Sequence, residues 1–161
     1  MAIRYLKMVL LLCVSFQVLL IGIQNFANLD QAYASVAYVA SNADHVAYPN
    51  SAFPALTSPF LIWMALGAIL IGEFGGGFLS LKGTWDLFNN RNASADEFNA
   101  AKTFGILGCG VIMVTFFGLF LDVGGVIFQM WQTQIGNGAW SGSFIYMGST
   151  AFVLLFLNMK D

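Results

Sequence analysis

Four long runs of apolar residues, separated by more polar segments, dominate the sequence. They cover roughly residues 5–24, 60–81, 103–128 and 140–157. A helix of about 20 mostly apolar residues crosses roughly 30 Å of hydrocarbon, and each run has that length. Transmembrane strands would alternate apolar and polar residues, which these runs do not do. The pattern therefore predicts one all-α membrane domain, residues 1–161, with four transmembrane helices.

The polar segments between the runs differ in charge. The first, residues 25–59, holds Asp30, Asp44 and all three prolines but no Lys or Arg. Residues 31–40 within it are expected to form a short helix at the membrane interface. The second segment, residues 82–102, holds three bases, and the third, residues 129–139, is uncharged.

All six basic residues fall on the same side of the four predicted spans. Because loops rich in Lys and Arg stay in the cytoplasm, both termini and the second polar segment are expected there. We expect a multi-pass protein of the bacterial inner (cytoplasmic) membrane, with a first span that is retained rather than cleaved as a signal peptide. The bases are Arg4, Lys7, Lys82, Arg91, Lys102 and Lys160. Aromatic residues agree with this orientation, because belts of Trp and Tyr mark both membrane surfaces. Near the outer helix ends lie Trp63, Trp131 and Trp140, and near the inner ends lie Tyr5 and Trp85.

Composition agrees with a membrane location and narrows the partners. Apolar residues make up 58% of the chain and charged residues only 9%, against roughly 25% charged in a soluble domain. No basic stripe of the kind that binds nucleic acid is present, so we expect no nucleic-acid partner. Cys13 and Cys109 lie inside apolar runs, where we expect small core or lipid-facing residues rather than a disulfide. His45 is the only histidine, so we expect no haem, metal or other cofactor, and bound membrane lipid instead.

Glu73 lies inside the second run, roughly 13 Å from the predicted cytoplasmic side by helix rise. An ionisable group at such depth is costly and is by default a candidate functional residue. Two interpretations remain open: a carboxylate that titrates or binds a cation, or a carboxyl that hydrogen-bonds to neighbouring helices or another subunit.

Small residues surround Glu73. Gly72 and Gly76 are four positions apart, and Gly76, Gly77 and Ser80 share the face of Glu73 on a helix. Small residues at this spacing let helix backbones approach closely. This face is expected to contact protein, either the third span of the same chain or another subunit.

Asp122 lies in the outer third of the third run, roughly 10 Å from its end. It is expected to be shallow enough to reach interfacial water, and a direct pair with Glu73 would need an unusual tilt. Gln17 and Gln24, seven positions apart on the first span, are expected to hydrogen-bond to neighbouring helices.

The chain resembles a known family in several segments: FNAAKTFGILG from Phe98, GGVIFQMWQTQIGNG, AFVLLFLNMKD, and upstream TSPFLIWMALGAILIGEF and KGTWDLF. It is similar to the domain of unknown function 2165 family of predicted small integral membrane proteins. Phe98, Asn99 and Lys102, and the Met130-Trp131-Gln132 piece, are the most specific parts, so Trp131 and Gln132 join the candidate functional or packing residues. The resemblance implies the four-helix topology and transfers no catalytic residue.

No nucleophile, metal set or catalytic pair is visible, so we expect no enzyme. The leading hypothesis is a non-catalytic accessory subunit that packs with other membrane subunits of a larger complex, such as a respiratory or other energy-converting one. The alternative is a small transporter or channel in which Glu73 lines the path. Because four helices leave little room for a pore, that alternative needs a homo-oligomer or a partner.

Overall fold

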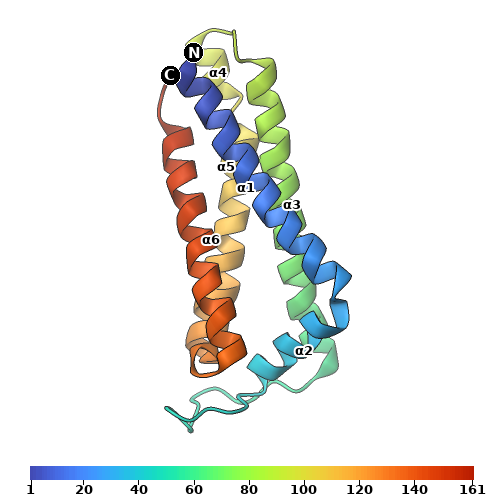
Figure 1. Ribbon diagram of the computed structural model, residues 1–161. Helices are drawn as coiled ribbons and strands as arrows, with labels where there is room; N and C mark the ends of the chain where they lie inside the picture. The colour runs from blue at the N-terminus through green and yellow to red at the C-terminus, as the bar shows by residue number, and fades with distance from the viewer.

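Four helical segments run side by side along most of the molecule, and each is long and apolar enough to cross a membrane (Figure 1). The computed structural model describes residues 1–161, which form helices and connections without any strand. The spans are α1 (Ala2–Ala27), α3 (Pro59–Asn89), a third that combines α4 (Ala95–Ala100), α5 (Thr103–Met113) and η1 (Val114–Ile127), and α6 (Gln134–Asn158).

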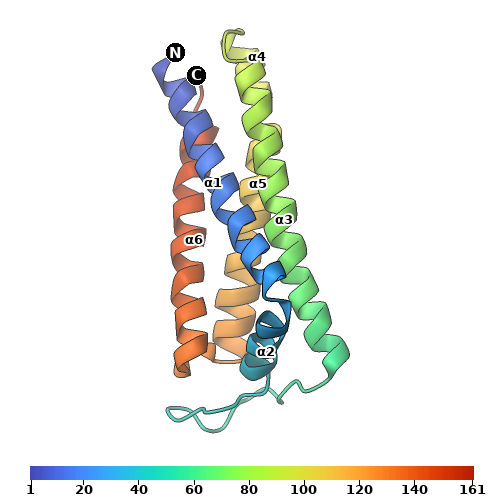
Figure 2. The ribbon, with the colours of Figure 1, turned by 45° about the vertical axis from the view of Figure 1, so that its right-hand side comes forward.

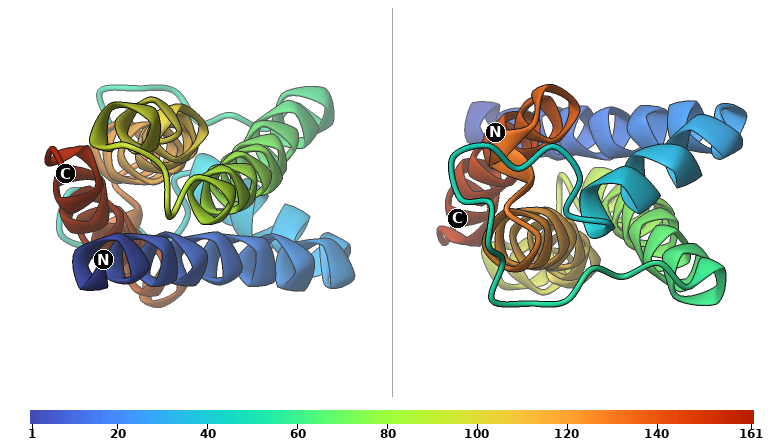
Figure 3. Two further views of the ribbon diagram at one scale, coloured as in Figure 1. Left: turned by 90° about the horizontal axis from the view of Figure 1, so that it is seen from above. Right: turned by 90° about the horizontal axis from the view of Figure 1, so that it is seen from below.

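The two ends of the bundle differ in what they carry. Both termini and α4 lie at one end, here called the terminal end (Figure 1). A helix that crosses beneath the bundle, α2 (Leu29–Ala40), lies at the other, the α2 end, together with the connection 41–58. The short 3-10 helix η2 (Met130–Gln132) follows η1. Seen along the bundle, α1 packs on α3, α3 on α5, α5 and η1 on α6, and α6 returns to α1 (Figure 3).

The helices extend beyond the apolar runs of the sequence. The α3 helix continues to Asn89, eight residues past the predicted end at 81, and α6 starts at Gln134 rather than at 140. Hydropathy marks only the part of a helix in hydrocarbon, whereas backbone hydrogen bonds continue into the interface. The segment predicted as a loop, 82–102, is therefore mostly helical, and α4 within it begins at a capping box made by Ser94 and Glu97.

The short helix expected at 31–40 is present as α2, residues Leu29–Ala40. It follows α1 after the single residue Asn28 and is anchored to α3 by Tyr33, whose ring lies 4.7 Å from that of Trp63. The helix therefore covers the α2 end of the bundle at the level of an aromatic belt.

The second half of the third span is a π-helix of 14 residues. Its last turn shows the wider winding, because the N–H of Phe128 donates to the carbonyl of Val123 at 3.0 Å, five positions back. Left-handed Gln129 (φ 47°) ends the segment and turns the chain toward α6. A π-helix of this length changes which residues of the third span share a face.

The core lies toward the terminal half of the bundle. Phe98 from α4 and Leu87 from α3 are fully buried there, together with Cys109, while Cys13 is exposed on α1. Residues from all four spans contribute to this core: Met8, Leu11, Val14, Val18, Leu87, Phe98, Cys109, Ile112, Phe116 and Leu157.

Candidate functional site

Glu73 is fully buried between α1 and α3. The Nδ2 group of Asn25 donates to both carboxyl oxygens, at 2.8 Å to Oε1 and 3.0 Å to Oε2. Gly22 makes room on α1, because a Cβ at that position would stand 3.3 Å from the Cβ of Glu73. The carboxyl of Glu73 is thus held by one amide and enclosed by two helices.

The glycines around Glu73 bring α3 close to two different helices. A Cβ on Gly72 would collide with the side chain of Thr115 at the start of η1, and one on Gly76 would meet Ile112 of α5 at 2.6 Å. On another face, a Cβ on Gly77 would lie 2.6 Å from Leu19 of α1. Gly72, Gly76, Gly77 and Ser80 are all buried, so these close approaches are contacts within the chain.

Asp122 has the opposite environment. It is exposed on η1 and lies five positions before the end of that helix at Ile127. The indole of Trp140 covers Gly125, three positions further on, where a Cβ would stand 2.6 Å from Nε1. The carboxylate therefore lies just inside the aromatic belt of the α2 end, and no ion pair of the structure reaches it.

Trp131 and Gln132 tie together two connections at the α2 end. The N–H of Tyr48 donates to Oε1 of Gln132 at 2.8 Å, and Nε2 of Gln132 donates to Oε1 of Gln129 at 2.6 Å. The ring of Trp131 meets that of Tyr48 edge-on at 5.7 Å. These contacts hold the connection 41–58 against the turn between η1 and α6.

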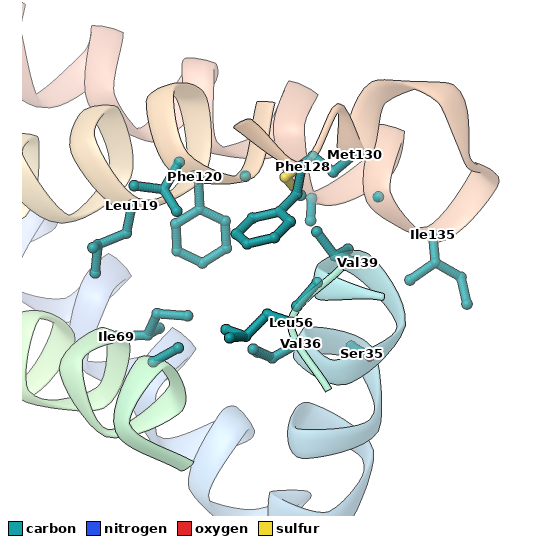
Figure 4. A pocket seen from close by; sticks show the side chains of 16 residues that line it. Ser35, Val36, Val39, Leu56, Ile69, Leu119, Phe120, Phe128, Met130 and Ile135 are labelled. Carbon is teal, nitrogen blue, oxygen red and sulfur yellow. The ribbon is translucent and has the colours of Figure 1, made fainter. Parts of the chain in front are cut away.

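A cavity of about 150 Å³ lies between α2, α3, η1 and α6 (Figure 4). Side chains from these helices point into it, and nearly all are apolar. Ile69, which lines it, is four positions before Glu73 on α3. Such an apolar lining favours contact with small apolar groups. Its residues include Val36, Val39, Leu56, Ile69, Leu119, Phe120, Phe128 and Met130.

A buried ion cluster lies at the terminal end and was not predicted from the sequence. The Nζ atoms of Lys7 and Lys102 lie 2.9 Å and 2.7 Å from the same carboxylate oxygen of Asp161. Both lysines are almost fully buried, and both also donate to the carbonyl of Met159. In the sequence these bases indicate only a membrane side, although all three charges fall at the same helix ends.

Two opposing effects act on Asp161. Burial alone would raise the pKa of its carboxyl, but hydrogen bonds from Lys102 and Lys7 outweigh burial and hold that pKa below its ordinary value. A lowered folded-state pKa means that the carboxylate stabilises the fold above about pH 3.9, the ordinary value. That contribution is lost as the pH falls through the lower value of the folded protein.

The amide that holds Glu73 is not one of those expected from the sequence. Gln17 and Gln24 form no side-chain hydrogen bond, and Gln24 is exposed, so the expectation that they bond to neighbouring helices was wrong. Asn25, the next residue, turns toward α3 instead. Asn25 lies three positions after Gly22, on the face of α1 that approaches α3, and only the structure shows which face that is.

Glu73 has one amide partner, Asp122 has none in the chain, and no group of three or more His, Cys, Asp or Glu side chains is arranged to hold a metal ion.

The fold and these sites define an integral membrane protein whose several apolar helices span the bilayer. The sequence matches the family model of DUF2165, described as predicted small integral membrane protein, over residues 3–160, and the chain belongs to this family. No curated protein and no solved structure matches the chain.

Proposed function

We propose that this protein is a non-catalytic accessory subunit that packs against another membrane protein through the outward face of η1. The observation that carries the proposal is Asp122, a carboxylate exposed on a membrane-spanning segment without a partner in its own chain.

The surroundings of Asp122 suit a protein neighbour. Val114, Phe117 and Val126 are exposed on the same segment, so the carboxylate interrupts an otherwise apolar outer face. Gly118 lies between them, and a Cβ there would meet nothing within 4 Å. Charged groups within spans usually pair with each other or face a protein interior, because hydrocarbon does not solvate them. A partner helix that supplies Lys or Arg would satisfy the charge of Asp122.

Charge distribution favours a different protein over a second copy. All six bases of the chain lie toward the terminal end: at the start of α1, in the second half of α3, beside α4 and after α6. A second copy with the same orientation therefore brings no base to the level of Asp122. A partner with a basic residue near the α2 end would supply what this chain lacks.

Glu73 has a structural role in this proposal. Its two oxygens accept from Asn25, and its side chain has no exposed surface through which a substrate could reach it. The transporter hypothesis would need Glu73 to face a path. Flux into liposomes that is unchanged by Glu73→Gln supports the accessory role, whereas Glu73-dependent flux contradicts it.

The direct test is affinity purification from native membranes, followed by mass spectrometry of the complex. We expect a stable partner with wild-type protein and with Asp30→Ala, which removes another exposed acid at the α2 end. We expect Asp122→Ala to lower partner recovery at least about ten-fold, because a partly buried charge pair contributes more than 1.4 kcal/mol. Isolation of the chain alone, or equal recovery with Asp30→Ala and Asp122→Ala, contradicts the proposal.

A further inference from the structure

A groove runs between α1 and α3 at the terminal end. The two helices lie together near the middle of the molecule and diverge toward this end (Figure 2). Gly77 and Gly22 fix the close approach, since Cβ atoms there would meet Leu19 and Glu73 respectively. Because the helices are tilted, contact at that level leaves a space of about 830 Å³ nearer the termini.

The lining of the groove is apolar. Its walls are apolar and consist of Met8, Val9 and Leu12 from α1 and Phe78, Leu81 and Trp85 from α3. Tyr5, Lys82, Thr84 and Phe88 complete the lining, and almost all the surface that the groove presents is apolar. The volume lies within the roughly 300–1,000 Å³ of pockets that hold whole organic ligands. An apolar trough of this volume can hold an acyl chain.

Basic groups collect at the end of this groove. Lys82 lines it and is half-exposed, and the guanidinium of Arg91 lies 4.2 Å from the ring centre of Phe88, another lining residue. Arg4, next to Tyr5, closes the end by donating to the carbonyls of Arg91 and Ala93.

One acid opposes these bases. Asp86 accepts from Lys82 at 2.5 and 2.7 Å. An ammonium group has three donors, so Lys82 keeps one for another acceptor. The remaining acids of this end are engaged elsewhere or lie on α4: Glu97 accepts hydrogen bonds from Ser94, Asp161 binds Lys7 and Lys102, and Asp96 is exposed on α4.

We propose that this groove binds one anionic phospholipid of the adjacent leaflet, with an acyl chain between α1 and α3 and the phosphate at Lys82 and Arg91. Basic pockets between transmembrane helices, on the membrane side where a protein carries its Lys and Arg residues, bind anionic lipid headgroups. The indole of Trp85 and the phenol of Tyr5 lie where headgroup and acyl chain meet, as aromatic residues of an interface do. The site is independent of the partner face on η1, which lies on another span.

Native mass spectrometry of the detergent-solubilised protein tests this site. The protein is titrated with phosphatidylglycerol and with phosphatidylcholine of identical acyl chains. We expect one phosphatidylglycerol to bind in preference, and Lys82→Gln to reduce that preference about five-fold, as one base near a membrane surface provides. Lys160→Gln makes the same charge change after α6 and should leave the preference unchanged.

Two further variants separate a site from a general charge effect. Asp86→Asn frees Lys82 and should strengthen phosphatidylglycerol binding, a gain that misfolding cannot imitate. Val9→Trp fills the groove and should weaken both lipids, whereas Val126→Trp, on exposed η1, should not. Equal binding of both lipids, equal loss with Lys82→Gln and Lys160→Gln, or no effect of Val9→Trp would overturn the proposal.

Discussion

The buried carboxyl of Glu73 is stabilised by hydrogen bonds from a single side chain, the amide of Asn25. With no exposed surface, its carboxyl has no access to water, and Asn25 is the only group that donates to it. A buried acceptor that loses its donor costs about 1–3 kcal/mol, and more when it is charged. The Asn25–Glu73 pair is therefore the polar link within an otherwise apolar α1–α3 contact.

Asn25→Ala should lower the free energy of unfolding by about 1–3 kcal/mol, because it leaves both oxygens of Glu73 without a donor. The measurement is thermal or denaturant unfolding in detergent micelles, with Gln24→Ala as the matched control, since Gln24 is exposed and its side chain bonds to nothing. In the Glu73→Leu background, Asn25→Ala should cost much less, which a double-mutant cycle measures. If Asn25→Ala behaves like Gln24→Ala, the amide does not stabilise Glu73.

Of the Asn25–Glu73 pair, only Glu73 could be recognised from the sequence. Glu73 stands out as the only acid in the middle of an apolar run. Asn25 could not be recognised because the first apolar run ends at Gln24, and an amide beyond that point looks like the start of a loop. The helix in fact continues to Ala27, which places Asn25 on its inner face.

Among the elements, α3 has the most demanding packing. Its glycines allow α5 and η1 on one face and α1 on another to approach closely. Neighbouring Gly75 lies on α3 too, but a Cβ there would meet nothing within 4 Å. Adjacent glycines of one helix thus have opposite tolerance for a side chain.

Gly76→Leu should destabilise the bundle by about 1–3 kcal/mol or prevent its assembly, because the side chain would enter the space of Ile112 and the backbone of Gly108. Gly75→Leu adds the same atoms toward open space and should be near neutral. Thermal unfolding and the monodispersity of the purified variants provide the comparison. Equal stability of Gly75→Leu and Gly76→Leu would refute this packing. We also expect Gly76→Leu to be at least as disruptive as Glu73→Gln, because the amide of Gln keeps hydrogen-bonding capacity.

The element scale also marks a limit of the sequence. A continuous apolar run predicts a span, but the few polar positions of the third run, such as Thr115 and Asp122, do not distinguish an α-helix from a wider π-helix. Along η1, Thr115 packs against Gly72 and Trp140 lies over Gly125. Those neighbours come from other spans, so only the folded bundle reveals which face of η1 carries Asp122.

The whole molecule is electrically asymmetric. All six bases lie toward the terminal end, while the α2 end holds Asp30, Asp44 and Asp122 without a base. The number of spans and this division of charge were predictable, because each depends on local composition. Which spans become neighbours was not, since α1 on α3 and α6 on η1 depend on side-chain shape across distant parts of the chain.

Reporter fusions should place the terminal end in the cytoplasm. We expect fusions at residue 90 and after Lys160 to give a cytoplasmic signal, and a fusion near Asn50 to give a signal on the far side, because Lys and Arg are retained inside. Paired reporters that are active on only one side of the membrane give the measurement. A far-side signal at residue 90 would reverse the orientation.

The cluster of Lys7, Lys102 and Asp161 has a consequence for biosynthesis. Lys7 and Asp161 are 154 positions apart, so the ribosome makes the ammonium group long before its carboxylate. Until then Lys7 stays with water and lipid phosphates at the interface, since burial without a counter-charge is costly. The terminal end can therefore close only after α6 has entered the bilayer, and insertion of all four spans precedes their final packing.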